Sequence, residues 1–334
     1  MEHILGSCTF GFYFTVFKSH AIHLFSILTM RKYLLKTLFF VIIYAILHVV
    51  VICLAGPVVT YYQIGSFGQM FNRIKDIPNH KNPDILFIGS SHAYRGFDTR
   101  VFEKAGITSF NLGSLAQTPM QTEVLFKKYL DVIAPKSIIF EVYPILFQND
   151  GVESTADLIS NDHIDAEICK LAFKSGNIRL INTLIYGVYQ EYFRGIRSKF
   201  QEKTVIRNDK YISGGYVEKL VSSAYVEKNS DSPIEIEINP KQLQAFNNCI
   251  SMVQDRQIPF LMVKAPLPKS TNSNLENLEE FNEVINSYGT YLDFNELMQL
   301  EDTCFFDFHH LRQQGVELFN ERLIQVMDSL QFGD

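Results

Sequence analysis

The chain has 334 residues, a formal net charge of −6 and no long run of lysine or arginine. This balance argues against a nucleic-acid partner, and the length suits one membrane anchor with one large domain, or two small domains. The five cysteines are widely spaced and form no Cys-x-x-Cys motif, so we expect no zinc site and no redox motif, while a disulfide among Cys169, Cys249 and Cys304 stays open. We also expect no cofactor.

An uncharged apolar stretch is the first predicted element. No charged side chain occurs between Thr37 and Ala55, and as a helix this stretch spans roughly 28 Å, close to the thickness of the bilayer hydrocarbon core. The basic residues just before it are Arg31, Lys32 and Lys36. We therefore expect a transmembrane anchor over residues 30–56, with a cytoplasmic N-terminus and the following residues on the outer side of the cell (inner) membrane.

A cleaved signal peptide is the alternative for this stretch. The apolar run is long for a signal peptide, and bulky Ile52 and Leu54 make a poor cleavage site, so we favour the uncleaved anchor. Residues 1–29 are a separate extension, because Met30 with its basic neighbours resembles a natural start. They are either a translation-start extension or a weak additional membrane helix. Residues 57–80 form a connector.

From residue 81 onward, short apolar strands alternate with amphipathic helices. Strands are expected over 84–88, 107–112, 136–142, 259–263 and 291–294, and helices over 98–105, 119–133, 241–256, 275–287 and 312–330. This alternation implies right-handed crossovers and a parallel sheet covered on both faces. We therefore predict a three-layer α/β/α domain over residues 81–330, with flavodoxin-like strand order.

An insertion at about residues 150–240 interrupts the alternation. Its first part, 157–200, predicts helices rich in aromatic residues, and aromatic residues at helical spacing indicate packing in the core rather than a ligand groove. Its second part, 205–238, contains Gly214-Gly215 and alternating polar residues, which favour an irregular segment with a hairpin.

Ser91 stands where the first expected strand, 84–88, runs into a Gly-Ser turn. A serine at a sharp strand-to-helix turn is a candidate nucleophile, and its own backbone N–H becomes a candidate oxyanion donor. The same serines fit the simpler role of helix caps. His92 and Arg95 follow in the next turn and are candidates for contacting a sugar or a carboxylate, or for a structural role there.

Asp307 and His310 lie three residues apart, just before the last predicted helix. We expect His310 to act as general base and then general acid, and Asp307 to fix the tautomer of its ring. His309 is the competing base, and we expect its side chain to point elsewhere. A surface Asp-His pair at a helix start is the structural alternative.

Together these segments resemble the SGNH (GDSL-like) hydrolase superfamily over about residues 81–330. Gly89-Ser90-Ser91 resembles its first block, with Ser91 as nucleophile and Ser90 where aspartate is usual. Asn111-Leu112-Gly113 resembles the second block, and the resemblance implies that the Gly113 N–H is an oxyanion donor and that Asn111 lies at the substrate. Asp307 and His310 resemble the last block, with Gly315 following.

The third block departs from the family pattern. The family usually supplies an asparagine there, whereas this chain has Glu141-Val142-Tyr143-Pro144. An ionised glutamate does not donate a hydrogen bond, so one oxyanion donor is in doubt. Because Glu141 and Tyr143 lie at the carboxyl end of the third expected strand, we expect both at the substrate.

The anchor and the Gly-Ser-Ser-His sequence are more similar to the envelope branch of the superfamily, which O-acetylates alginate and related polysaccharides or esterifies teichoic acid with D-alanine. The resemblance implies a serine O-acyltransferase or esterase that adds or removes acyl groups on a cell-envelope glycan, beside a multi-span membrane acyltransferase. The alternatives are an esterase or lipase with water as acceptor, and a non-catalytic component of an envelope assembly complex that keeps the fold.

Overall fold

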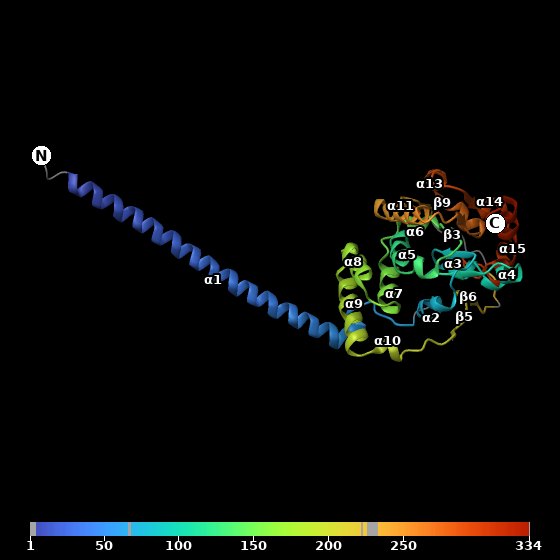
Figure 1. Cartoon of the computed structure of the whole chain (residues 1–334), viewed down its shortest axis with the longest axis horizontal. Coiled ribbons are helices and arrows are strands. Elements are labelled where there is room, and N and C mark those ends of the chain that lie inside the picture. The colour runs from blue at the N-terminus through green and yellow to red at the C-terminus, as the bar shows by residue number, and fades with distance from the viewer. Residues whose placement is uncertain (1–4, 66–67, 222, 226–232, 334) are drawn as a thin grey trace. The chain divides into compact units, whose positions relative to one another are not determined.

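The computed structural model describes residues 5–65, 68–221, 223–225 and 233–333, with side chains from residue 29 onward (Figure 1). The chain divides into two units, residues 1–55 and 56–334. Four cysteines have described side chains and all four are free thiols: Cys53, Cys169, Cys249 and Cys304. The disulfides that the sequence left open are therefore absent among these described cysteines.

The N-terminal unit is helical. Helix α1 (Leu5–Val59) includes Ala55, where the backbone leaves helical geometry with φ −111° and ψ 19°. Within it, Thr29–Val59 has a mean hydropathy of 3.0 and is long and apolar enough to cross a membrane. Apolar side chains such as Phe40 and Leu54 are exposed rather than packed, as expected for a helix whose solvent is lipid.

The second unit contains a five-stranded parallel sheet with the order β10-β8-β3-β1-β2. Its strands are β1 (Ile85–Ile88), β2 (Ser109–Asn111), β3 (Ser137–Glu141), β8 (Phe260–Lys264) and β10 (Tyr291–Asp293). Counted along the chain this is the order 2-1-3-4-5, so the flavodoxin-like prediction is confirmed.

Helices cover both faces of this sheet. Leu86 and Ile88 of β1 point into one apolar core, whereas Ile85 and Phe87 point into the other, as the two-residue period of a strand requires. The first core is shared with α5 (Pro119–Ile133), α6 (Pro144–Gln148), α11 (Pro240–Asp255) and α13 (Leu278–Asn286), and the second with α3 (Ser91–Gly96), α4 (Thr99–Lys104), α14 (Phe294–Leu297) and α15 (Gln313–Leu330). The three-layer α/β/α class is thereby confirmed.

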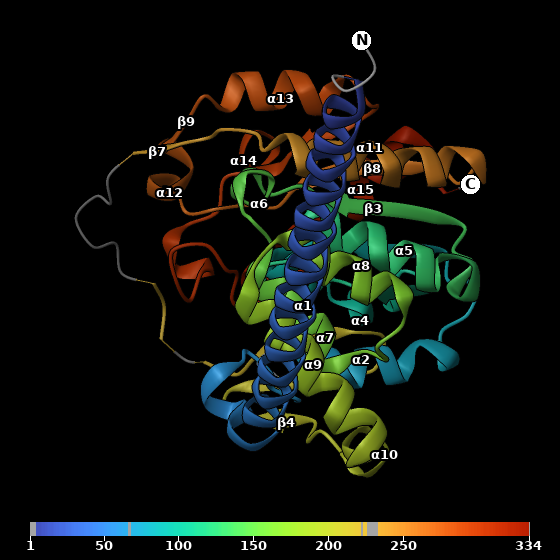
Figure 2. The ribbon, with the colours of Figure 1, turned by 90° about the vertical axis from the view of Figure 1, so that its left-hand side faces the viewer.

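Helices from the insertion extend the first layer. They are α7 (Val152–Asn161), α8 (Ala166–Ser175), α9 (Ile178–Val188), the π-helix η2 (Tyr189–Phe193) and α10 (Ile196–Lys199). Helix α8 lies beside α5, which it contacts (Figure 2). Of the aromatic residues, Tyr186 is buried, whereas Phe173, Tyr192 and Phe193 are exposed, so the prediction that this stripe is core holds only in part.

The rest of the insertion forms a three-stranded antiparallel sheet, β4 (Val205–Ile206), β5 (Asp209–Ile212) and β6 (Tyr216–Lys219). It reaches the outer strand of the main sheet, because the Asn111 N–H donates to the Gly214 carbonyl oxygen at 2.7 Å. Gly215 adopts φ +96°, and a Cβ there would lie 2.1 Å from the Asn111 carbonyl oxygen. Glycine is therefore required where the hairpin meets the sheet edge.

The remaining short elements are α2 (Met70–Asp76), η1 (Ile77–Asn79), α12 (Lys269–Ser273) and η3 (Asp302–Cys304), with β7 (Ile234–Glu235) paired to β9 (Leu275–Glu276). The helix expected over 275–287 begins only at Leu278. Residues 275 and 276 are instead in a strand, because β7 supplies them with a hydrogen-bonding partner.

Candidate active site

Three chain segments, which follow the first three strands, meet at the carboxyl ends of the parallel strands. Strand β1 ends at Ile88 and is followed by Gly89, whose φ is +149°, and α3 begins at Ser91. A Cβ on Gly89 would lie 2.7 Å from the Glu141 Cβ at the end of β3, so only glycine lets the two strand ends come so close. A Cβ on Gly113, beyond the end of β2, would lie 3.0 Å from the Ser90 carbonyl oxygen.

The hydroxyl of Ser91 meets the imidazole of His310 at this edge. Ser91 Oγ lies 2.8 Å from His310 Nε2, and His310 Nδ1 lies 2.8 Å from Asp307 Oδ2. Ser91 itself is half-buried and therefore open to solvent. The structure thus brings the three residues into one hydrogen-bonded line with the geometry that a nucleophile, a base and an orienting acid require.

A tight loop holds the acid and the base. Asp307 Oδ1 accepts hydrogen bonds from the backbone N–H groups of His309 (2.9 Å) and His310 (2.7 Å), which leaves Oδ2 for the ring. The Gly315 position that follows is tightly packed, since a Cβ there would lie 2.5 Å from the Cys304 carbonyl oxygen. Asp307 therefore sets both the backbone of this loop and the tautomer of its histidine.

The charges of the site suit a general base. Burial alone would raise the pKa of Asp307, but the hydrogen bond and the charge of His310 lower it well below the usual range. Burial lowers the pKa of His310 to about 4, although Asp307 opposes this shift. His310 is consequently neutral at pH 7 and able to accept a proton from Ser91.

Two backbone N–H groups were predicted as oxyanion donors. Among the described residues, nothing accepts a hydrogen bond from the Ser91 N–H at the start of α3, so it is available to an oxyanion. The Gly113 N–H donates to Asn111 Oδ1 at 3.1 Å. Gly113 would have to exchange this partner for an oxyanion, so its role stays a prediction.

Asn111 does not lie at the substrate, contrary to the prediction. Its side chain is fully buried, and Nδ2 donates to the carbonyl oxygens of Ala93 (2.7 Å) and Phe97 (3.2 Å). Asn111 therefore ties the nucleophile helix to β2. Its side-chain amide makes hydrogen bonds to backbone groups, as buried polar groups normally do.

Arg95 takes the structural role, which the sequence left open as the alternative to binding a substrate. Its guanidinium makes a bidentate ion pair with Asp209 of β5, at 3.0 and 2.9 Å, and both side chains are buried. Lys219 of β6 donates to the same carboxylate at 2.8 Å. Arg95 thus fixes the hairpin to the nucleophile helix and has no free face for a substrate carboxylate.

Glu141 supports the nucleophile turn rather than a substrate. Its Oε2 accepts hydrogen bonds from the Ser90 N–H (3.1 Å) and the Ser90 hydroxyl (2.8 Å), and Ser90 Oγ accepts the His92 N–H at 3.1 Å. The second oxygen, Oε1, lies 3.5 Å from His92 Nδ1. A glutamate at the end of β3 is therefore hydrogen-bonded to Ser90, the residue just before the candidate nucleophile.

Aromatic rings surround the base. The ring centroid of His92 lies 4.2 Å from that of Tyr143 and 5.3 Å from that of His310. His92 and Tyr143, both predicted to contact the substrate, therefore lie close to the triad, although both are buried. His309 does not point elsewhere as expected, because its ring centroid is 3.8 Å from that of His310. The two rings are tilted by 54° to each other. The sequence gives no sign of this packing except that the two histidines are neighbours.

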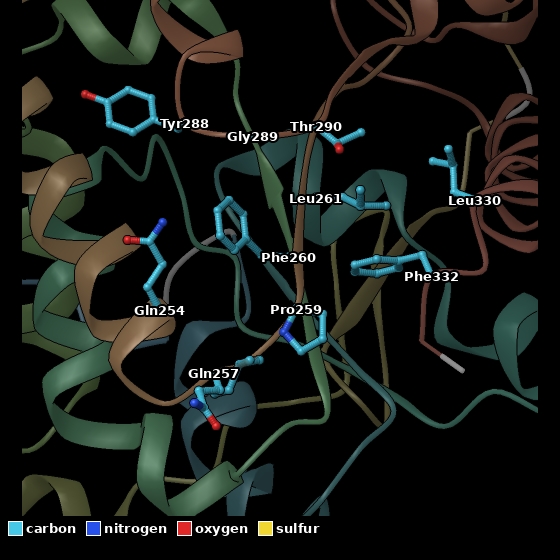
Figure 3. A pocket seen from close by; sticks show the side chains of 11 residues that line it. Gln254, Gln257, Pro259, Phe260, Leu261, Tyr288, Gly289, Thr290, Leu330 and Phe332 are labelled. Carbon is cyan, nitrogen blue, oxygen red and sulfur yellow. The ribbon is translucent and has the colours of Figure 1, made fainter.

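A separate cavity of about 600 Å³ lies at the amino ends of the strands β8 and β10 (Figure 3). Its lining includes Pro259 and Phe260, at the amino end of β8, and Thr290, just before β10. Because the triad lies at the carboxyl ends of the strands, this cavity is not part of the candidate active site.

Neither a protein-family model nor a curated protein sequence matches the chain. Among solved structures it is similar to a Bacteroides fragilis protein assigned as an acylhydrolase, at 9% identity and a TM-score of 0.39, over 79% of this chain and 98% of that one. It is also similar to a GDSL-like lipase of Bacteroides thetaiotaomicron, at 10% identity and a TM-score of 0.40, over 79% and 100%. Similarity at this level carries no information about a substrate.

Proposed function

We propose that the chain is a membrane-anchored serine esterase or O-acyltransferase of the SGNH type, which forms an acyl ester on Ser91. The observation that carries the proposal is the continuous line from Asp307 through His310 to Ser91, with 2.8 Å at both hydrogen bonds. A helix cap would need neither contact. The neutral state of His310 and the unoccupied Ser91 N–H add the base and one oxyanion donor.

The geometry supports a two-step reaction. Ser91 Oγ attacks the carbonyl carbon of an ester while His310 Nε2 takes its proton, and the Ser91 N–H stabilises the resulting oxyanion. When this intermediate collapses, His310 gives the proton to the leaving alcohol, and the acyl group stays on Ser91 as an ester. An acceptor hydroxyl then loses its proton to His310 and attacks that ester, which restores the serine.

We infer in addition that the enzyme adds acyl groups such as acetyl to the hydroxyls of a cell-envelope glycan, or removes them from it. This inference is supported by the helix Thr29–Val59, long and apolar enough to hold the enzyme at a membrane, and by the basic residues ahead of its apolar run. They favour a cytoplasmic N-terminus and a catalytic domain outside the cell membrane. A multi-span membrane acyltransferase would supply the acyl group to such an enzyme.

An esterase with water as acceptor is the second candidate. The half-buried, solvent-accessible Ser91 favours it, because transfer to a glycan must exclude water from the acyl-enzyme. Incubating the enzyme with an acetyl ester and an envelope oligosaccharide separates the two. Acetylated oligosaccharide indicates transfer, whereas free acetate alone indicates hydrolysis.

The central test compares full-length protein in detergent with its Ser91→Ala variant on p-nitrophenyl acetate. We expect the variant to lose about a thousandfold or more in kcat/KM and to escape labelling by a fluorophosphonate. Ser329→Ala, on the exposed face near the end of α15, is the matched control and should behave as wild type. Equal turnover by wild type and Ser91→Ala would remove Ser91 from the mechanism.

A further inference from the structure

Three imidazole rings converge beside the nucleophile. His92 comes from α3, and His309 and His310 come from the loop before α15. Each offers one ring nitrogen such that the three atoms lie within 4.8 Å of one another. Neutral imidazole nitrogens are among the commonest ligands for zinc and related divalent ions.

One ring nitrogen of these three histidines is buried without a partner. His92 is 4% exposed, and its Nε2 accepts or donates no hydrogen bond among the described residues. A buried polar atom left unsatisfied costs free energy, so a native structure normally gives it a partner or a ligand. His92 Nδ1 faces Glu141 Oε1 at 3.5 Å, which leaves Nε2 as the nitrogen for that ligand.

Carboxylates stand behind two of the three rings. Asp307 Oδ2 is bonded to His310 Nδ1 at 2.8 Å, and Glu141 lies against His92 Nδ1. Metal-binding histidines typically give their second nitrogen to a carboxylate, as His310 does to Asp307, which fixes the ring and raises its basicity.

The spacing needs only a small adjustment to suit zinc. Zinc binds histidine nitrogens at about 2.0–2.1 Å. Three nitrogens at the corners of a triangle with 4.8 Å sides, the upper limit here, lie about 2.8 Å from its centre, so each moves inward by roughly 0.7 Å at most. Rotations of side chains achieve such a shift, and the fourth position stays open to water.

We propose that His92, His309 and His310 form a binding site for a divalent transition-metal ion of the zinc class, and that the bound ion inhibits the enzyme. The ion replaces the Ser91 proton as the partner of His310 Nε2, so Ser91 keeps its proton and is no longer activated. Binding is reversible, involves no change of oxidation state, and is undone by a chelator. The inhibitory effect rests on the proposed esterase function, whereas the binding of the ion does not.

The binding test uses the metal-free full-length protein in detergent and Zn²⁺ in competition with a chromophoric chelator. We expect one tight equivalent in wild type, and at least tenfold weaker binding in both His92→Gln and His309→Gln. His163→Gln, an exposed histidine paired with Glu191 on another surface, is the matched control and should bind like wild type. Circular dichroism establishes that each variant is folded, and the half-buried His309 gives a second variant should His92→Gln misfold.

The activity test titrates Zn²⁺ into the esterase assay and expresses each rate relative to the metal-free rate of the same variant. We expect inhibition of wild type that a chelator reverses, and a half-inhibitory concentration at least tenfold higher in both variants. Absence of tight binding to wild type, or binding that neither variant weakens, overturns the site. Activation by Zn²⁺ overturns the inhibitory role. Site-specific binding in a protein that cleaves no ester keeps the site and refutes the proposed function instead.

Discussion

Replacing Asp307 with asparagine should abolish most of the activity while leaving the loop intact. In the variant, the two backbone N–H groups of His309 and His310 still need the Oδ1 acceptor that they now share, at 2.9 and 2.7 Å. The asparagine amide must therefore turn its NH₂ toward His310 Nδ1. That nitrogen then accepts a hydrogen bond, the ring proton moves to Nε2, and His310 loses the lone pair that would take the Ser91 proton.

The expected loss is large, because the base is present in the wrong tautomer. We expect kcat/KM to fall by about 10³ to 10⁴, equivalent to roughly 4–5.5 kcal/mol of transition-state stabilisation, similar to the effect of the same substitution in the triad of a serine protease. The free energy of unfolding should change little in Asp307→Asn, whereas Asp307→Ala loses two backbone hydrogen bonds and should cost about 2 kcal/mol.

The assay is ester hydrolysis in the presence of a chelator, paired with urea unfolding of the same samples. Asp307→Asn should combine nearly wild-type stability with nearly lost activity, which separates orientation of the ring from folding of the loop. An Asp307→Asn variant that keeps more than a tenth of the wild-type rate would refute the reasoning, because the tautomer of His310 would then not depend on Asp307.

Three further predictions concern stability. Arg95→Met should lower the free energy of unfolding, measured by chemical denaturation, by about 3–5 kcal/mol, because it leaves Asp209 buried with only Lys219 as a partner. Adding Asp209→Asn to this variant should recover part of the loss. Gly89→Ala should leave little folded protein on size-exclusion chromatography, since its Cβ would lie 2.7 Å from Glu141 Cβ, and a normally folded variant would contradict the tight contact. Burial raises the pKa of Glu202 to about 7 from 4.5, so the contribution of this side chain to the unfolding free energy is fully present below pH 4.5 and falls by up to about 3 kcal/mol as the pH rises through 7. Glu202→Gln should remove this part of the slope between pH 4.5 and 7. A slope unchanged in Glu202→Gln would assign it to other groups.

The parts of the fold that local signals define were predictable from the sequence. Helix α5 begins at Pro119 and ends at Ile133 as expected, because Thr118 and Gln121 form a capping box and proline is favoured in the first turn. The order of apolar strands and helices likewise indicated the parallel sheet. Strand ends shifted by one or two residues, since neighbouring strands decide where pairing stops.

The roles of charged residues near the nucleophile were not predictable, because their partners are distant in the chain. Nothing local to Arg95 reveals that Asp209 of the hairpin neutralises it, and nothing near Glu141 reveals its bonds to Ser90. The sequence placed Ser91, Asp307 and His310 at one edge of the sheet, which the structure reproduces. It treated His309 as a residue facing away, since ring orientation in a loop depends on packing rather than on spacing.

The hairpin β5–β6 has a consequence for anyone who trims this protein to a minimal domain. The strand β2 is the last in its sheet, and an unpaired strand border offers free N–H and C=O groups to any passing chain. Gly214 and Gly215 of the hairpin cover part of this edge strand. The ion pair between Arg95 and Asp209 holds the hairpin against the helix that carries Ser91. Excising residues 205–219 would therefore yield a shorter protein that self-associates through β2. Even in the fraction that stays monomeric, the Ser91 hydroxyl would be poorly oriented toward His310.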